Sequence, residues 1–102
     1  MIRRLWHGWT ASENADAYEQ LLRDMIFPGI RSRGIVGLTG LEAWRHEGPD
    51  EVEFVTVMTF DDESAVAEFT GGDPARSVVP EEAQRLLARF DEHSRHYALV
   101  VQ

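Results

Sequence analysis

The chain has 102 residues, of which 43% are hydrophobic and 27% charged, and its formal net charge at pH 7 is −8. These values are typical of one soluble globular domain, so we expect a single domain over residues 1–102. The acidic balance argues against nucleic-acid binding, which depends on clustered lysine and arginine. No apolar stretch reaches the roughly 20 residues that span a bilayer, so we expect no membrane partner.

The sequence contains no cysteine, which excludes disulfides, thiolate metal ligands and a cysteine nucleophile. The first residues include two arginines but only a short apolar stretch, and no cleavage site of small residues follows. This pattern does not fit a secretory signal. We therefore expect a cytoplasmic protein.

The first predicted elements are a strand and an amphipathic helix. Residues 2–10 are rich in aromatic and branched side chains, which favour a strand. Thr10 and Glu13 have the spacing of a capping box, with Ser12 as an alternative N-cap. Proline cannot continue a helical hydrogen-bond ladder, so we expect Pro28–Gly29 to end or bend the helix. The apolar stripe of this helix consists of Ala15, Tyr18, Leu21, Leu22, Met25 and Ile26.

Two strands follow. Residues 35–46 predict the first of them, in which Gly37 and Gly40 indicate a bulge or a close backbone approach. A turn at residues 48–50 leads to the next strand, over residues 52–60. One face of that strand carries Phe54, Thr56, Met58 and Phe60, and the other carries Val55, Val57 and Thr59. Because a sheet with one solvated face should alternate apolar with polar residues, we expect a partner's sheet to cover the second face.

The remaining residues predict helices and a closing strand. Asp61–Asp62 and Gly71–Gly72 bound a short helix, and residues 73–79 are expected to be irregular or a short helical turn. Pro80 starts a further helix, whose stripe is Ala83, Leu86, Leu87 and Phe90. Residues 96–101 predict the last strand. The fold class is therefore α+β, a ferredoxin-like βαββαβ order with an antiparallel four-stranded sheet.

Four segments of the chain carry a family resemblance: His7-Gly8-Trp9-Thr10 through Tyr18, Phe27-Pro28-Gly29-Ile30, Glu51-Val52-Glu53-Phe54 and His96-Tyr97. Together they are similar to the antibiotic biosynthesis monooxygenase superfamily over nearly the whole chain. The resemblance implies a dimeric α+β barrel, in which two copies pair sheet to sheet as a homodimer. It implies the fold more closely than the activity, because the superfamily contains cofactor-independent oxygenases, haem-degrading enzymes, isomerases and decarboxylases.

The haem-degrading branch does not fit this sequence. Those relatives carry an asparagine on the first strand, a tryptophan on the second helix and a histidine iron ligand shortly afterwards. The corresponding positions here hold Trp6, Phe69 and Val79, and residues 62–92 contain no histidine. We therefore expect no haem, and the resemblance to the cofactor-independent oxygenases implies no other cofactor.

The oxygenase branch needs less from the protein. A reduced aromatic substrate such as a quinol or anthrone is deprotonated and reacts with dioxygen itself, while the protein supplies a dry pocket, a proton acceptor and an oxyanion donor. The resemblance thus implies a small hydrophobic or aromatic ligand. The candidate catalytic groups are His7, Arg4 and His96. The candidate pocket residues are Trp6, Trp9, Trp44, Thr56, Met58 and Tyr97.

Each candidate also has a purely structural interpretation, and a non-catalytic ligand-binding or structural homodimer is the alternative function. Tryptophans are ordinary core and interface residues, and His7 fits an interface hydrogen bond. Arg4 on an apolar strand needs a partner, for which Glu53 is the candidate. His93 and His96 are three residues apart but are expected on different elements, so we predict no metal site.

Overall fold

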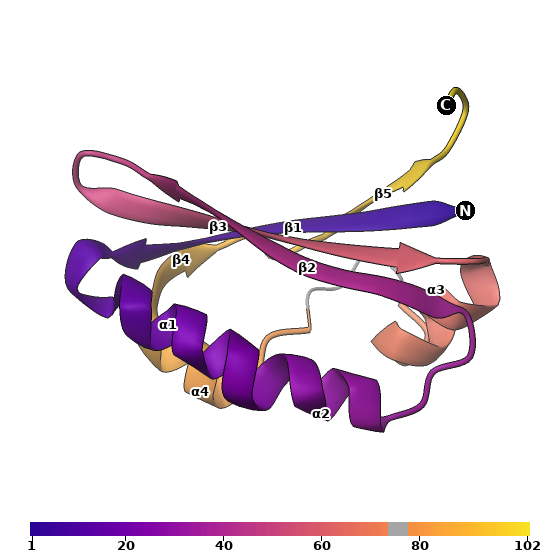
Figure 1. Cartoon of the computed structure of the whole chain (residues 1–102), viewed down its shortest axis with the longest axis horizontal. Helices are drawn as coiled ribbons and strands as arrows, with labels where there is room; N and C mark the ends of the chain where they lie inside the picture. Colours follow the sequence, from indigo (N-terminus) through magenta and orange to yellow (C-terminus); the bar gives the residue numbers. More distant parts are fainter. Residues whose placement is uncertain (74–77) are drawn as a thin grey trace.

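The protein has two layers, an antiparallel sheet and a set of helices on one of its faces (Figure 1). The computed structural model describes residues 1–73 and 78–102. The strands are β1 (Ile2–Ala11), β2 (Leu38–Glu47), β3 (Glu51–Phe60), β4 (Leu87–Phe90) and β5 (Arg95–Ala98). The helical elements are η1 (Ser12–Asn14), α1 (Ala15–Leu21), the π-helical turn η2 (Leu22–Ile26), α2 (Phe27–Ser32), α3 (Glu63–Thr70) and α4 (Glu81–Leu86). None of the described helices combines the length and the apolar character needed to cross a membrane.

The sheet has the order β2-β3-β1-β4, and β5 also pairs with β1. β5 lies opposite residues 2–5 of β1 and β4 lies opposite residues 8–10, so the two short strands share one edge of β1. The α+β class and the antiparallel sheet are confirmed, and the element order is consistent with the ferredoxin-like prediction. The described residues form five strands instead of the four expected, because two short strands occupy the place of one.

The end of the last helix was predicted wrongly. α4 ends at Leu86, and Leu87 is already extended, with φ −81° and ψ 133°. Residues 87–90 then pair with the edge of β1, which would otherwise expose unpaired backbone groups. Phe90 packs against Trp6 with 5.9 Å between ring centroids. The last strand, β5, likewise ends at Ala98 and not at residue 101.

The N-terminal helix also differs from expectation at both ends. No side chain caps it: the chain enters through η1, and the hydroxyl of Thr10 is buried in β1 without a hydrogen-bond partner in the described structure. Helical backbone continues past Pro28–Gly29 to Ser32. Pro28 lies in the first turn of α2, where a missing N–H is tolerated. Of the segment 73–79 expected to be irregular, residues 74–77 lie outside the described residues.

Three local predictions are confirmed. The side chain of Asp62 accepts a hydrogen bond of 3.1 Å from the Ala65 N–H and caps α3. Gly71 ends that helix in the left-handed region, with φ 75°. The β2–β3 register shifts between Leu38 and Gly40, which is the irregularity predicted from the glycines.

The core lies between the sheet and the helices. Alternate residues of β3 point into it, as do the apolar faces of α1, α3 and α4. The core side chains group in two neighbouring clusters. The first contains Ala15, Tyr18, Leu22, Phe27, Val52, Phe54 and Ala83, and the second contains Ile35, Met58, Phe60, Ala65, Val66 and Phe69.

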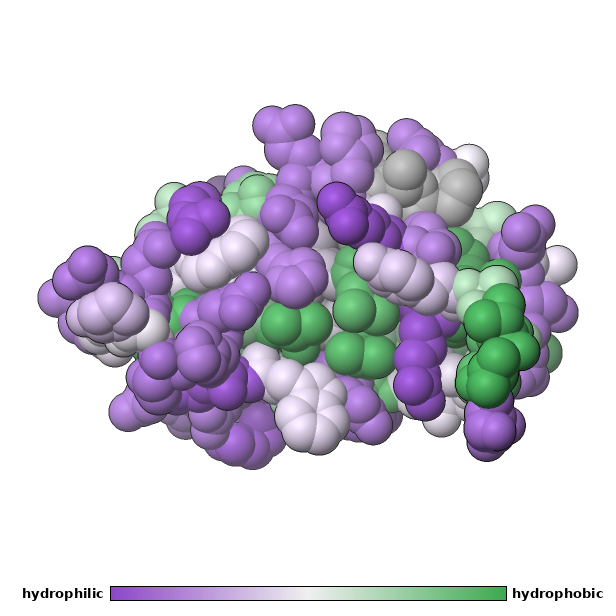
Figure 2. Space-filling model, turned by 90° about the horizontal axis from the view of Figure 1, so that it is seen from above, coloured by the Kyte–Doolittle hydropathy of each residue, from purple (hydrophilic) through white to green (hydrophobic). Residues whose placement is uncertain are grey.

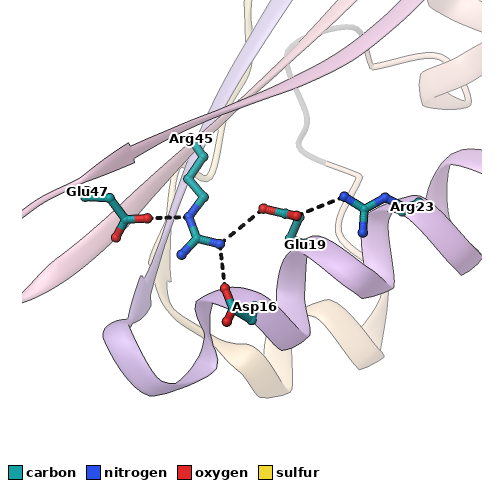
Figure 3. A network of polar contacts seen from close by, with 5 residues as sticks. All are labelled: Asp16, Glu19, Arg23, Arg45 and Glu47. Atoms are coloured by element: carbon teal, nitrogen blue, oxygen red, sulfur yellow. Dashed lines mark hydrogen bonds and ion pairs between the residues drawn. The ribbon is translucent and has the colours of Figure 1, made fainter.

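An ion-pair network joins the edge strand β2 to the N-terminal helix (Figure 3). Arg45 Nη1 donates to Asp16 and Glu19 over 2.9 and 3.1 Å, and its Nε donates to Glu47 over 2.6 Å. Arg23 donates to the other oxygen of Glu19 over 2.9 Å. Exposed ion pairs contribute little individually, but this one holds the β2 edge above α1.

Gly8 on β1 gives Trp6 its place in the core. A Cβ atom at Gly8 would lie 2.7 Å from the Trp6 ring and 3.0 Å from Leu87. Such distances are too short for carbon atoms, so the ring or the backbone would have to shift. The absence of a side chain at position 8 therefore leaves the space that the Trp6 indole occupies.

We expect Gly8→Ala to lower the free energy of unfolding by about 1–3 kcal/mol, the usual cost of an overpacked core. The matched control is Gly29→Ala in α2, where no atom lies within 4 Å of the added Cβ; there, alanine should stabilise the helix by about 0.5–1 kcal/mol. Urea unfolding followed by circular dichroism measures both. A Gly8→Ala protein as stable as the parent would contradict the crowding at Trp6.

Candidate functional site

A small pocket lies between the sheet and the helices, where the two core clusters meet. Its volume is about 50 Å³. β1 and β3 form its floor, and the helices form most of its wall. It is lined by Arg4, Trp6, Tyr18, Leu22, Ile26, Phe27, Ile30, Thr56, Met58, Phe69, Val78, Val79, Pro80, Ala83 and Ser94. This lining is mostly apolar and aromatic. Its few polar groups are therefore the candidates for a functional role.

Arg4 is the charged group of the pocket, and only 3% of it is exposed. Its Nη1 lies 3.0 Å from Nε2 of His96, directly across the β1–β5 pair. Its guanidinium carbon lies 5.4 Å from the centroid of the Phe69 ring. Burial lowers the pKa of Arg4 to about 10. Arg4 therefore still carries its positive charge at neutral pH.

His96 is the hydrogen-bond partner of that guanidinium. Arginine can only donate, so Nε2 of His96 accepts and the ring is neutral, with its proton on Nδ1. Burial, and secondarily the charge of Arg4, lower the pKa of His96 below its ordinary value. The two residues thus form a unit in which a neutral histidine orients a charged arginine.

Besides Thr56 on β3, the other polar groups of the pocket come from β1, α1 and the segment before β5. Trp6 lines the pocket, and its Nε1 donates to the Asp91 carbonyl over 2.9 Å. Tyr18 is 2% exposed and meets the Phe54 ring edge to face at 4.8 Å; burial raises the pKa of Tyr18. The hydroxyl of Ser94 is buried and finds no hydrogen-bond partner in the described structure.

The pocket brings together some of the residues predicted from the sequence. Arg4, Trp6, Thr56 and Met58 line it. His96 contacts it through Arg4. These residues share one face of the sheet because they occupy alternate positions of β1 and β3 and the matching position of β5.

The remaining predicted residues lie on the other face of the sheet, which none of the described helices covers. His7 Nδ1 lies 3.0 Å from Glu53 there, and its ring stacks on Trp9 at 6.1 Å. Trp44 and Tyr97 are 62% and 49% exposed on the same face. The predicted ion pair between Arg4 and Glu53 is wrong, because the two side chains point to opposite faces of the sheet.

Sequence reasoning missed Tyr18 and Ser94 as pocket residues. Tyr18 stood in the predicted helical stripe, so its burial was expected but its contact with the pocket was not. Ser94 follows β4, which the sequence pattern predicted as part of a helix. No local pattern marked Ser94 as a pocket residue.

The described residues place no cluster of metal-ligating side chains at the pocket. Within residues 1–73 and 78–102, no three or more metal-ligating side chains come together. His93 is exposed and His96 faces Arg4, so the two do not form a site with a third ligand.

The chain was also compared with known proteins. No protein-family model matches it, and no curated protein matches it either. The resemblance to the antibiotic biosynthesis monooxygenases therefore remains an expectation.

The lowered pKa of His96 has a consequence for stability. In the unfolded chain, histidine protonates near pH 6.5; in the folded protein, His96 does so at lower pH. As the pH falls through about 6.5, the unfolded state takes up a proton that the folded state does not, so stability falls. We expect His96→Gln to lose less stability than the parent between pH 7.5 and 5.5, measured by urea unfolding. His93→Gln, which removes an exposed histidine, is the control; an identical pH response of parent and His96→Gln would contradict the buried contact with Arg4.

Proposed function

We propose that the protein is a cofactor-independent monooxygenase-like homodimer with a ferredoxin-like fold, which acts on a small aromatic or quinone-like metabolite in the pocket at Arg4. The observation that carries this proposal is the composition of the pocket. A buried guanidinium and the Ser94 hydroxyl, which has no hydrogen-bond partner among the described residues, sit in a lining that is otherwise mostly apolar and aromatic.

The chemistry follows from the charge of Arg4. A guanidinium in a dry site stabilises a phenolate or enolate far more than water does, so a phenolic or enolic ligand would lose its proton more easily there. The resulting carbanion-like ring reduces dioxygen directly. For a methylene carbon, R₂CH₂ and O₂ give R₂C=O and H₂O: one oxygen atom enters the carbonyl, the other leaves as water with both hydrogens, and dioxygen takes up all four electrons.

His96 fits a supporting role in this scheme. Its Nε2 already accepts from Arg4, so it would serve first to orient the guanidinium toward the ligand oxygen. To accept a proton from the ligand, His96 would have to release Arg4. The neutral state favoured by its lowered pKa suits both roles. His7, on the opposite face, is too far removed for either role.

The size of the pocket favours a second candidate, a non-catalytic small-ligand-binding or structural homodimer. The free volume is about 50 Å³, whereas a cavity of roughly 150 Å³ holds benzene. An aromatic substrate would thus have to displace lining side chains, and the flexible Met58 is the most adaptable of them. A protein that never opens this space would use the same residues as core.

The homodimer part of the proposal is supported by the uncovered face of the sheet. Leu5, Val55 and Val57 lie at its centre and are only partly buried within one chain. Figure 2 shows apolar residues in the middle of this face and hydrophilic ones around much of its margin. A second sheet packed on it would bury that apolar centre.

The test of the proposed site is Arg4→Met, which keeps the length of the side chain and removes its charge. We expect it to weaken binding of a quinol or anthrone about ten- to a hundredfold, because hydrogen bonds to charged groups contribute about 1.5–3 kcal/mol. Quenching of tryptophan fluorescence measures binding, and an oxygen electrode measures turnover. Arg85→Met, on the exposed face of α4, is the control.

The possible outcomes separate the two candidates. Binding with oxygen uptake that Arg4→Met abolishes supports the oxygenase. Binding that depends on Arg4 without oxygen uptake supports the ligand-binding alternative. Binding that is equal in both variants and the parent overturns the assignment of the site.

A further inference from the structure

The uncovered face of the sheet, here called the open face, carries a hollow along its β4–β5 edge. β4 ends opposite Gly8 and β5 begins opposite Leu5, so neither strand pairs with residues 6–7 of β1. The hollow lies in this gap and has a volume of about 250 Å³. No described residue lines both the hollow and the pocket at Arg4. The lining of the hollow consists of Leu5, His7, Trp9, Asp91, Arg95 and Tyr97.

His7 is held in a defined orientation at the wall of the hollow. Its Nδ1 lies 3.0 Å from a carboxylate oxygen of Glu53, and its ring stacks on Trp9 with 6.1 Å between the ring centroids. Its backbone carbonyl accepts a hydrogen bond of 2.9 Å from the Asp91 N–H. Because a carboxylate can only accept, Nδ1 carries a proton, and in the neutral ring Nε2 is left as an acceptor. Among the described residues, Nε2 has no hydrogen-bond partner.

Trp9 is fixed in turn by Arg89 on β4. The guanidinium carbon of Arg89 lies 3.9 Å from the centroid of the Trp9 ring, which is an attractive distance for a cation over an aromatic face. Nη2 of Arg89 also donates to Glu51 over 2.9 Å. Glu53 and Trp9 therefore both restrain the His7 ring, and a side chain restrained by packing and by a hydrogen bond can hold a ligand in one geometry.

Arg95 supplies a positive charge to the same hollow. It lies on β5 opposite Leu5, which makes it a diagonal neighbour of His7, at a backbone separation of about 7–8 Å. Arg95 is exposed, and it forms no ion pair with any residue in the described ranges 1–73 and 78–102. An acceptor and a cation thus stand about one small molecule apart.

Asp91 adds a negative charge to the lining, and Arg89 offsets part of it. The pKa of Arg89 is raised, chiefly by its hydrogen bond to Glu51 and also by the charges of Asp91 and Glu53. The carboxylate of a bound acid is attracted by Arg95 and repelled by Asp91. The two charges therefore orient such a ligand.

The uncharged part of the lining favours an aromatic ligand. Leu5 is partly buried beneath the hollow, and Tyr97, 49% exposed, stands two residues beyond Arg95 on the same face of β5. Aromatic side chains pack well against other rings, offset or edge to face. A cavity of roughly 150 Å³ holds benzene, so the hollow has room for one substituted ring.

We propose that this hollow is a second ligand site, which binds a small aromatic acid that carries a hydroxyl group. The carboxylate pairs with Arg95, the hydroxyl donates to Nε2 of His7, and the ring lies over Leu5 beside Tyr97. All the lining residues belong to one chain, so the site rests neither on the proposed homodimer nor on the chemistry proposed at Arg4.

Nuclear magnetic resonance locates the bound ligand. para-Hydroxybenzoate is titrated into isotopically labelled protein, and the chemical shifts of the His7 imidazole, the Tyr97 ring and the Trp6 indole are followed. We expect shifts at His7 and Tyr97, and none at Trp6. Unchanged shifts at His7 and Tyr97 overturn the site, and so do shifts confined to Trp6, which would place the ligand in the pocket at Arg4.

Two variants and two simpler ligands test the roles of the side chains. Arg95→Met should raise the dissociation constant of para-hydroxybenzoate about tenfold or more and leave that of phenol unchanged. His7→Phe keeps a ring against Trp9 and removes Nε2; it should raise the constant about three- to tenfold and leave that of benzoate unchanged. Arg85→Met, which removes an exposed charge on α4, is the control. Equal affinity of the parent and both site variants overturns the proposal.

Arg4→Met separates this site from the proposed function. In that variant, para-hydroxybenzoate should shift the His7 signals with the parent's dissociation constant, whether or not the variant loses quinol binding. A His7 titration that weakens as much in Arg4→Met as in Arg95→Met would overturn a separate site on the open face.

Discussion

The alternation of β1 is the constraint on which the rest of the structure depends. β1 is hydrogen-bonded on both sides, to β3 along its whole length and to β4 and β5 on the other edge. Its register is therefore fixed, and successive side chains point to opposite faces. Arg4 and Trp6 face the helices, whereas Leu5, His7 and Trp9 face away from them. A slip by one residue would exchange the contents of the pocket and of the open face.

The same constraint explains how the chain tolerates a buried arginine. A charge in the core is costly unless it is hydrogen-bonded and well packed. Arg4 has His96 opposite it on β5 and the Phe69 ring beneath it, and its lowered pKa reflects the burial that remains. A core position of this kind is more easily occupied by leucine or valine. The buried charge of Arg4 is the physical reason for the proposal that the pocket takes an anionic or oxyanion-forming ligand.

The sequence predicted those parts of the fold that are encoded by local patterns. The strands β1 and β3, the capped helix α3 and the irregularity near Gly40 followed from periodicity, a capping aspartate and glycine. The end of α4 was not predicted correctly, because Leu86, Leu87 and Phe90 fit a helical stripe that continues past Leu86. The competing interaction was the unpaired edge of β1, a tertiary feature that no local pattern reveals. For the same reason Ser94, which follows β4, was not predicted as a pocket residue.

The candidate site was predicted only as far as the face of each strand could be assigned. Residue types suggested histidines, tryptophans and an arginine, but type alone does not tell which face of the sheet a residue occupies. The structure divides them into two groups: Arg4, Trp6 and His96 on the helical face, and His7, Trp9 and Trp44 on the open face. The two groups are joined by one backbone, since Arg4 and Leu5 are neighbours on β1. A second sheet packed on Leu5, as in the proposed homodimer, would restrain the strand that holds Arg4, so assembly of such a dimer would be coupled to the geometry of the pocket.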